Sequence, residues 1–267
     1  MAIACLASSL CFDSAKGMDT AIGVAAEPLG PRAGTGQTLE DACRRAGAGD
    51  PSELLAMLPR LSQDYRRSIP HVALHALGLM VAQRKAEAKA DCVLAETMLV
   101  ERRSQFIDPA VCRMLYAVYS DLGDHAAGLN LLRRTVQQHP RDRHLLNQLA
   151  WDLATLPDSR VRNGAEAMGL AKRACEETRW KDWQVVDTYA AAAAENRQWD
   201  LAVHWQSEAI AMATKKSESP ADVGRLGKRL ALYRAHRSHH DPVHDPVYAG
   251  WSRRVLQTVV FFREQGR

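Results

Sequence analysis

Residues 109–142, PAVCRMLYAVYSDLGDHAAGLNLLRRTVQQHPRD, decide the fold of this chain. Apolar residues recur at helical spacing on both sides of a turn made by Leu122, Gly123 and Asp124, and Pro140 ends the second half. This pattern predicts two antiparallel helices. A length of about 34 residues is typical of one helix pair in a helical repeat protein, so the same period is expected elsewhere in the chain.

The period continues downstream. Leu149 occupies the place of Leu115 one repeat later, and the second helix of that unit carries a row of alanines. An enlarged loop at 156–164 separates the two helices of that unit. A third unit places Tyr189 on its first helix and Ala202 on its second. A weaker unit covers 71–104. The stacking of such pairs buries one continuous core, which predicts an ordered array of helix pairs.

The composition agrees with an all-helical chain. Alanine and leucine dominate the apolar residues, which make up 46% of the 267 residues, and aromatic residues are only 6%. Alternating stretches of Val, Ile and Thr, which are typical of strands, are nearly absent. We therefore predict an all-α fold, a right-handed α-solenoid of stacked antiparallel helix pairs.

Several short motifs resemble a family. They are NQLAWDLATLPD at 147–158, RNG at 162–164, ACE at 174–176, DTYAA at 187–191 and RLALY at 229–233. The chain resembles a bacterial subgroup of tetratricopeptide repeat proteins over 147–236, and the general family pattern over 71–142. Arg197 departs from the pattern, because a turn glycine is usual there. The resemblance implies a peptide- or protein-binding scaffold closed by a capping helix.

The sequence predicts three regions. Residues 1–37 are rich in Ala, Gly, Ser and Pro and are expected to form a disordered leader. Residues 38–237 form the repeat domain, which opens with a short helical pair in which Asp50 caps a helix beginning at Pro51. Residues 238–267 form a His-rich tail that ends in a short amphipathic helix. Its apolar face is expected to dock on the rest of the chain.

A partner-binding strip follows from the resemblance, since side chains off the apolar seam of the first helices line the concave face of such arrays. Trp151, Asn147 and His144 share this strip with Thr155. The neighbouring first helices add Arg113 and Asp187, among others. Trp is a frequent hot-spot residue in interfaces. Two interpretations of Trp151 remain open here, a binding anchor and a side chain that fills the space between helix pairs.

The sequence contains no recognised motif for catalysis, so we predict a non-catalytic protein without cofactor. His71 and His75 lie one helical turn apart, and the tail carries His236, His239 and His240, but a surface or flexible position explains these residues without a metal. No metal ligand is assigned. Six cysteines without a C-x-x-C pair indicate small buried thiols and a reducing compartment, which predicts a cytoplasmic location.

The charge distribution bears on the partner. The net charge of +4 is small, and the arginine pairs lie far apart among acidic residues. Those pairs are Arg44–Arg45, Arg66–Arg67, Arg102–Arg103, Arg133–Arg134 and Arg253–Arg254. Clustered stripes of Lys and Arg mark nucleic-acid binding, so a protein or peptide partner is favoured and a nucleic-acid partner is kept as the alternative. No apolar run reaches the length of a membrane span.

Overall fold

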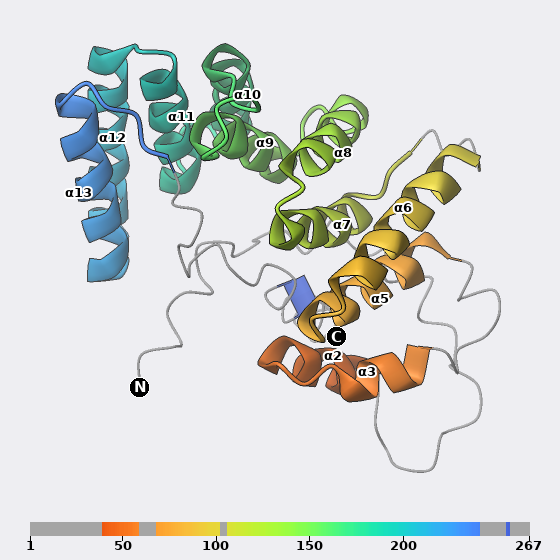
Figure 1. Cartoon of the computed structure of the whole chain (residues 1–267). Coiled ribbons are helices and arrows are strands. Elements are labelled where there is room, and N and C mark those ends of the chain that lie inside the picture. Colours follow the sequence, from red (N-terminus) through yellow and green to blue (C-terminus); the bar gives the residue numbers. More distant parts are fainter. Residues whose placement is uncertain (1–38, 59–67, 102–105, 241–254, 257–267) are drawn as a thin grey trace. The chain divides into compact units, whose positions relative to one another are not determined.

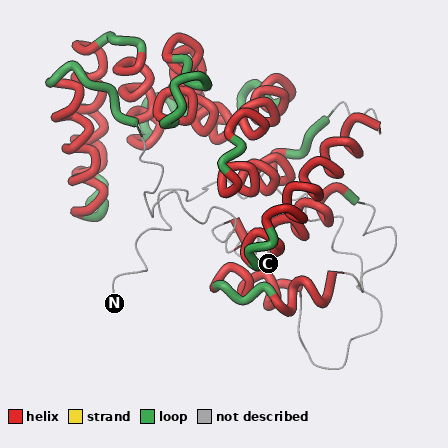
Figure 2. Tube along the Cα trace, viewed as in Figure 1, coloured by secondary structure: helices red, strands yellow, loops and turns green. Residues whose placement is uncertain are grey.

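The fold of the described residues is all-helical in a computed structural model of the chain (Figure 2). The structure describes residues 39–58, 68–101, 106–240 and 255–256. Within these ranges every regular element is a helix and there is no strand, as the sequence predicted. The predicted leader lies outside the described residues, as does all of the tail helix except Val255 and Leu256. Leu256 is fully buried, in agreement with the expected docking of that segment.

The chain divides into two compact units, which are described separately. One unit contains Leu132–Asp245, and the other contains Leu10–Leu131 together with Pro246–Arg267. The boundary falls within α8 (His125–Gln138).

The unit that precedes this boundary contains five helices among its described residues. They are α2 (Leu39–Ala48), α3 (Ser52–Met57), α5 (Ile69–Val81), α6 (Lys85–Glu101) and α7 (Pro109–Leu122). Each helix contacts the next, and α5 also contacts α7. The carboxylate of Asp50 accepts the backbone N–H of Ser52 at 3.1 Å. The helix begins one residue later than predicted, at Ser52, with Pro51 in place of Asp50 as its N-cap residue.

Helix α7 shows how local sequence sets the ends of the elements. The Asp108 carboxylate accepts the backbone N–H groups of Ala110 and Val111, and Pro109 occupies the first turn, where its missing N–H costs nothing. Gly123 ends the helix in the left-handed region with φ 74°. Glycine adopts this conformation without steric cost, so the predicted turn at Gly123 is confirmed.

The second unit contains α9 (Arg143–Thr155), α10 (Gly164–Glu177), α11 (Trp183–Glu195), α12 (Trp199–Lys215) and α13 (Pro220–Arg234). Each helix packs on the next, and α9 also contacts α11 (Figure 1). The buried faces carry small residues, because a methyl side chain lets two helix backbones approach closely. The fully buried alanines of these helices are Ala150, Ala167, Ala171, Ala174, Ala190, Ala192, Ala193, Ala194, Ala202, Ala209 and Ala213.

Polar contacts within each unit recur at about the length of one repeat. Lys89 pairs with Asp124, 35 positions later. Arg133 binds Glu166 through two nitrogens across 33 positions, and Arg141 binds Glu177 across 36. The guanidinium of Arg173 donates to the carbonyl of Pro140, again 33 positions away. Successive helix pairs are therefore connected at their surfaces as well as through the alanine core.

The turns that follow several helices have left-handed backbone at residues other than glycine. Arg197, where the family pattern has glycine, adopts φ 58° after α11. The same region is occupied by Gln83 after α5, Arg179 and Trp180 after α10, Ser217 after α12 and His236 after α13. The departure from the pattern at Arg197 therefore leaves the turn conformation intact.

Candidate partner-binding site

Helix α9 separates a buried seam from a partly exposed strip. The Asp142 carboxylate caps the helix by accepting the backbone N–H groups of His144 and Leu145. The apolar seam is buried and consists of Leu145, Leu146, Leu149, Ala150, Leu153 and Ala154. His144, Asn147 and Trp151 are half-buried, in agreement with their predicted position off this seam.

Thr155 is a correction to the predicted strip. Its side chain is fully buried, and its hydroxyl donates to the carbonyl of Trp151 at 2.9 Å. A threonine in a helix often bonds the carbonyl four residues earlier, which removes the hydroxyl from the surface. Thr155 therefore offers no polar group to a partner.

Two groups from distant positions in the sequence contact the Trp151 indole. The guanidinium carbon of Arg229, on α13, lies 5.3 Å from the centre of the ring. The imidazole of His239, in the segment after α13, lies 6.0 Å from it at an interplanar angle of 51°. A cation within about 6 Å of an indole is attracted by the ring quadrupole, so Trp151 and Arg229 stabilise each other.

Asp187 is buried beneath this contact. Its carboxylate accepts hydrogen bonds from Arg229 Nε at 2.9 Å and Nη2 at 2.7 Å, and from Gln206 Nε2 at 2.8 Å. Only 5% of Asp187 is exposed, so its charge is neutralised within the chain. Asp187 contributes to the site by fixing the guanidinium beside Trp151 rather than by presenting a carboxylate to a partner.

The other predicted residues differ in their surroundings. Asn147 lies one turn before Trp151, and its Oδ1 atom is buried without a hydrogen-bond partner among the described residues. His144 Nε2 accepts from Arg143 Nε at 3.2 Å. Arg113 is half-buried on α7, in the unit that is described separately. Within the present unit, Asn147 and His144 share α9 with Trp151, and Asp187 is connected to Trp151 through Arg229.

Residues 236–240, here named the strap, also contribute to this site, and the sequence did not predict their role. His236 stacks on Trp199 with the ring centres 5.4 Å apart and the planes at 8°. The Ser238 hydroxyl donates to the carbonyl of Ala194 at 3.1 Å. His240 Nε2 lies 2.8 Å from Glu195 Oε2. The strap therefore crosses the end of α11 and reaches Trp151 on α9 through His239.

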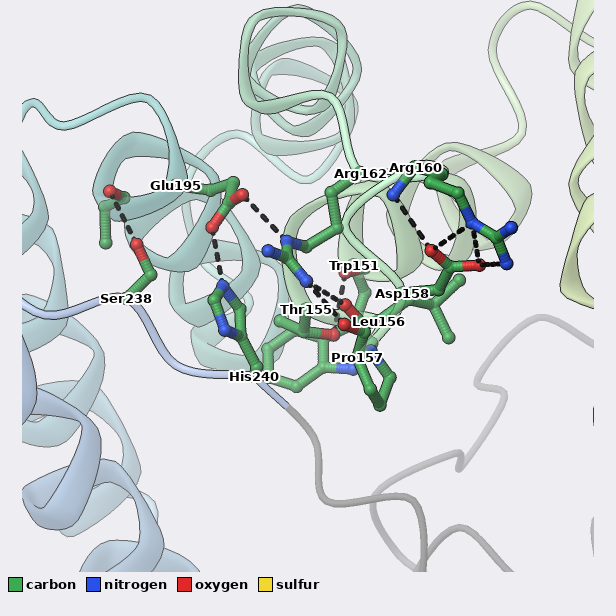
Figure 3. Close-up of polar contacts among 11 residues, drawn as sticks. Trp151, Thr155, Leu156, Pro157, Asp158, Arg160, Arg162, Glu195, Ser238 and His240 are labelled. Carbon is green, nitrogen blue, oxygen red and sulfur yellow. Dashed lines mark hydrogen bonds and ion pairs between the residues drawn. The ribbon is translucent and has the colours of Figure 1, made fainter.

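The enlarged loop at 156–164 holds Glu195, the carboxylate that His240 of the strap contacts (Figure 3). Arg162 donates from Nη1 to the carbonyls of Leu156 and Pro157 at 2.7 and 2.9 Å, and from Nε to Glu195 Oε1 at 2.8 Å. These contacts leave Glu195 Oε2 directed at His240, as Figure 3 shows. The loop thus anchors Arg162, which in turn holds the Glu195 carboxylate.

The histidine pair and the cysteines that the sequence singled out have the following surroundings. His75 Nδ1 lies 2.6 Å from Asp91 Oδ2, and its ring stacks on that of His71. Among the described residues no group of three His, Cys, Asp or Glu side chains could hold a metal ion. The cysteines in these ranges are Cys43, Cys92, Cys112 and Cys175, and all are buried, as the sequence predicted for the last three.

The structure describes only some of the arginine pairs that the sequence contains. Arg44 is paired with Asp41, Arg45 with Glu53 and Arg133 with Glu166. The pairs at 66–67, 102–103 and 253–254 lie wholly or partly outside the described residues.

Within the part of the chain that the structure describes, no helix is both long and apolar enough to cross a membrane. Comparison of the chain with family models, with curated proteins and with solved structures gives no match.

Proposed function

We propose that this chain is a non-catalytic interaction scaffold of the tetratricopeptide type, a right-handed α-solenoid that binds a partner peptide or protein. The binding surface is the strip of Trp151, Asn147 and His144 on α9. The single observation that carries this proposal is the half-exposed Trp151, held beside a guanidinium that is itself fixed by Asp187. Trp and Arg are the residues most often found as interface hot spots.

Three further observations support the repeat assignment. Neighbouring helices pack in chain order, small residues line their contacts, and polar contacts recur across 33 to 36 positions. Each is what a stack of 34-residue helix pairs requires. The bacterial subgroup and a cytoplasmic location complete the proposal, and the four buried thiols suit a reducing compartment.

Nucleic-acid binding is the weaker alternative. A phosphate would have to displace a carboxylate from Arg44, Arg45 and Arg133, because each of these arginines is already in an ion pair. Binding to phosphates also weakens steeply with salt. A loss of affinity of about a thousandfold between 50 and 200 mM salt would favour this alternative over the proposed function.

The experiment that tests the proposal is partner capture with the full chain, followed by titration of the captured partner. Trp151→Ala is expected to raise the dissociation constant at least ~30-fold, which corresponds to ~2 kcal/mol and to an interface hot spot. Trp180→Ala is the matched control. It also removes one indole, but from a stack with Trp205 that lies outside the strip. An unchanged dissociation constant for Trp151→Ala would remove the strip from the proposal.

The stability of the same variant must be measured beside its affinity. Trp151 is half-buried and contacts Arg229, so both interpretations left open by the sequence apply to it in part. We expect Trp151→Ala to cost ~1–2 kcal/mol, between a surface change and a core truncation. Titration well below the melting temperature separates the loss of binding from the loss of folded protein.

A further inference from the structure

We infer that the strap is the resident occupant of the proposed binding strip, and that the partner is a short segment of the same chemistry. Such a segment places an imidazole or another aromatic ring against Trp151 and, at the next residue, a hydrogen-bond donor on Glu195. This inference rests on the proposed function and adds to it the chemistry of the ligand and the competitor that the ligand must displace.

The two groups that receive the strap are fixed by contacts that do not involve the strap. Glu195 is held by Arg162, and the side chains of this pair are only 16% and 12% exposed. Arg162 is anchored in turn on two loop carbonyls. Arg229 is fixed beside Trp151 by Asp187. When the strap leaves, the indole and the carboxylate oxygen therefore stay in place, as a preformed site for a ligand requires.

The strap lies at the surface. His236 and His240 are exposed, and Ser238 and His239 are half-buried. Its polar side-chain contacts on the described residues include the Ser238 bond to the carbonyl of Ala194 and the pair between His240 and Glu195. A competing segment can replace each of these contacts with one of the same kind, so displacement leaves no buried group unsatisfied.

The start of the strap is set by the end of α13. His236 takes φ 54°, and the backbone N–H of Arg237 donates to the carbonyl of Leu232 at 3.0 Å, which turns the chain back from the helix axis. His236 then stacks on Trp199. This tether keeps the strap at a high effective concentration near Trp151, so the apparent affinity of a partner is reduced by the fraction of strap that is bound.

The test uses the full chain and a defined probe. The probe is a fluorescein-labelled synthetic peptide of residues 235–245, AHRSHHDPVHD. The double variant His239→Ala/His240→Ala opens the strip, and His204→Ala, an exposed histidine on α12, is the matched control. We expect the peptide to bind the double variant at least tenfold more tightly than it binds the wild-type chain or His204→Ala.

Two further arms show where the peptide binds. A peptide with alanine at 239 and 240 should bind the double variant at least tenfold more weakly, and adding Trp151→Ala to the double variant should abolish binding of the original peptide. Equal binding of the peptide to wild-type, double variant and control would overturn the inference. So would a wild-type dimer that becomes monomeric in the double variant, since the strap would then sit on a second copy.

A direct readout of the contact does not depend on the peptide. Each of the six tryptophans gives one indole N–H signal in a ¹H–¹⁵N spectrum, and Trp151→Phe identifies the signal of Trp151. His239→Ala should shift that signal, whereas His204→Ala should leave it unchanged. An unshifted signal would overturn the inference. If the strap fails these tests while partner affinity still depends on Trp151, the proposed function stands and only the strap is lost.

Discussion

Arg229 on the last described long helix, α13, binds both carboxylate oxygens of Asp187 on α11, 42 positions earlier in the chain. Both side chains are nearly buried, with exposed fractions of 11% and 7%. Charges removed from water in this way need a partner of good geometry, and here Gln206 supplies a third hydrogen bond. The pair couples the closing helix to α11 and fixes the group that lies beside Trp151.

Asp187→Ala should therefore be strongly destabilising, by ~3–5 kcal/mol, because it removes the carboxylate that binds a nearly buried guanidinium through two hydrogen bonds. Urea unfolding followed by circular dichroism measures the change. Replacing both partners, in Asp187→Ala/Arg229→Met, should recover most of the loss. A double variant as unstable as the single one would show that the cost comes from packing and not from the unpaired charge.

Gly164 and Gly169, both on α10, provide a matched pair of substitutions. A Cβ atom at Gly164 would lie 2.7 Å from the backbone N of Asn196 and 2.8 Å from the carbonyl carbon of Glu195, whereas one at Gly169 would meet nothing within 4 Å. We expect Gly164→Ala to cost ~1–3 kcal/mol through overpacking and Gly169→Ala to gain ~0.5–1 kcal/mol. Equal effects of the two changes in a denaturant melt would contradict this placement of the loop.

Ala202 tests the register of the helix pairs. It is fully buried on α12, which packs against α11. Ala202→Trp should lower the unfolding free energy by ~1–3 kcal/mol or more, since the indole has no room in a contact built for a methyl group. Ala211→Trp, an exposed change on the same helix, should stay within ~0.5 kcal/mol. A melting temperature that does not respond to Ala202→Trp would mean that the register is wrong.

The buried thiols predict a dependence of stability on pH. Burial, and secondarily the nearby carboxylates, raise the pKa of Cys92 and of Cys175 from 9.0 to about 12. The folded state therefore keeps both thiols protonated after the unfolded chain has begun to lose its protons. This contribution to stability is complete below the ordinary thiol pKa and is lost as the pH rises from about 9 towards 12.

Two measurements check this expectation. The unfolding free energy should fall between pH 8 and pH 10, in the direction that the raised pKa requires. Iodoacetamide at pH 8 should label Cys92 and Cys175 only in the unfolded chain, because the thiolate is the reactive form. Labelling of either residue in the folded protein within minutes, detected by peptide mapping, would show that its thiol is less buried than the structure places it.

The sequence predicted the local features of the fold well. The turn at Gly123 and the buried seam of α9 each follow from residues a few positions apart, so a short window of sequence is enough to predict them. Trp151 was placed off the seam for the same reason. Helical periodicity indicates which face of a helix is buried, and it therefore also indicates which residues of α9 lie in the strip.

The contacts around Trp151 could not be predicted in this way. Asp187 was expected at the surface, but it is buried because Arg229, 42 positions away, neutralises it. Thr155 was expected beside Trp151, but its hydroxyl bonds the backbone instead. The strap follows no period, and its contact with Trp151 depends on the turn that His236 makes after α13. Contacts between residues this far apart in the chain cannot be predicted from residue spacing or composition.

The left-handed turns without glycine have a consequence for how this protein can change. Side chains occupy that region at Gln83, Arg197, Ser217 and His236, among others. Such a side chain strains the folded backbone by about 1 kcal/mol, and glycine would relieve the strain but give a similar amount of extra freedom to the unfolded chain. The two effects nearly offset each other. The turns at Gln83, Arg197 and Ser217 are therefore positions where the charge and size of the side chain can change while the fold is retained.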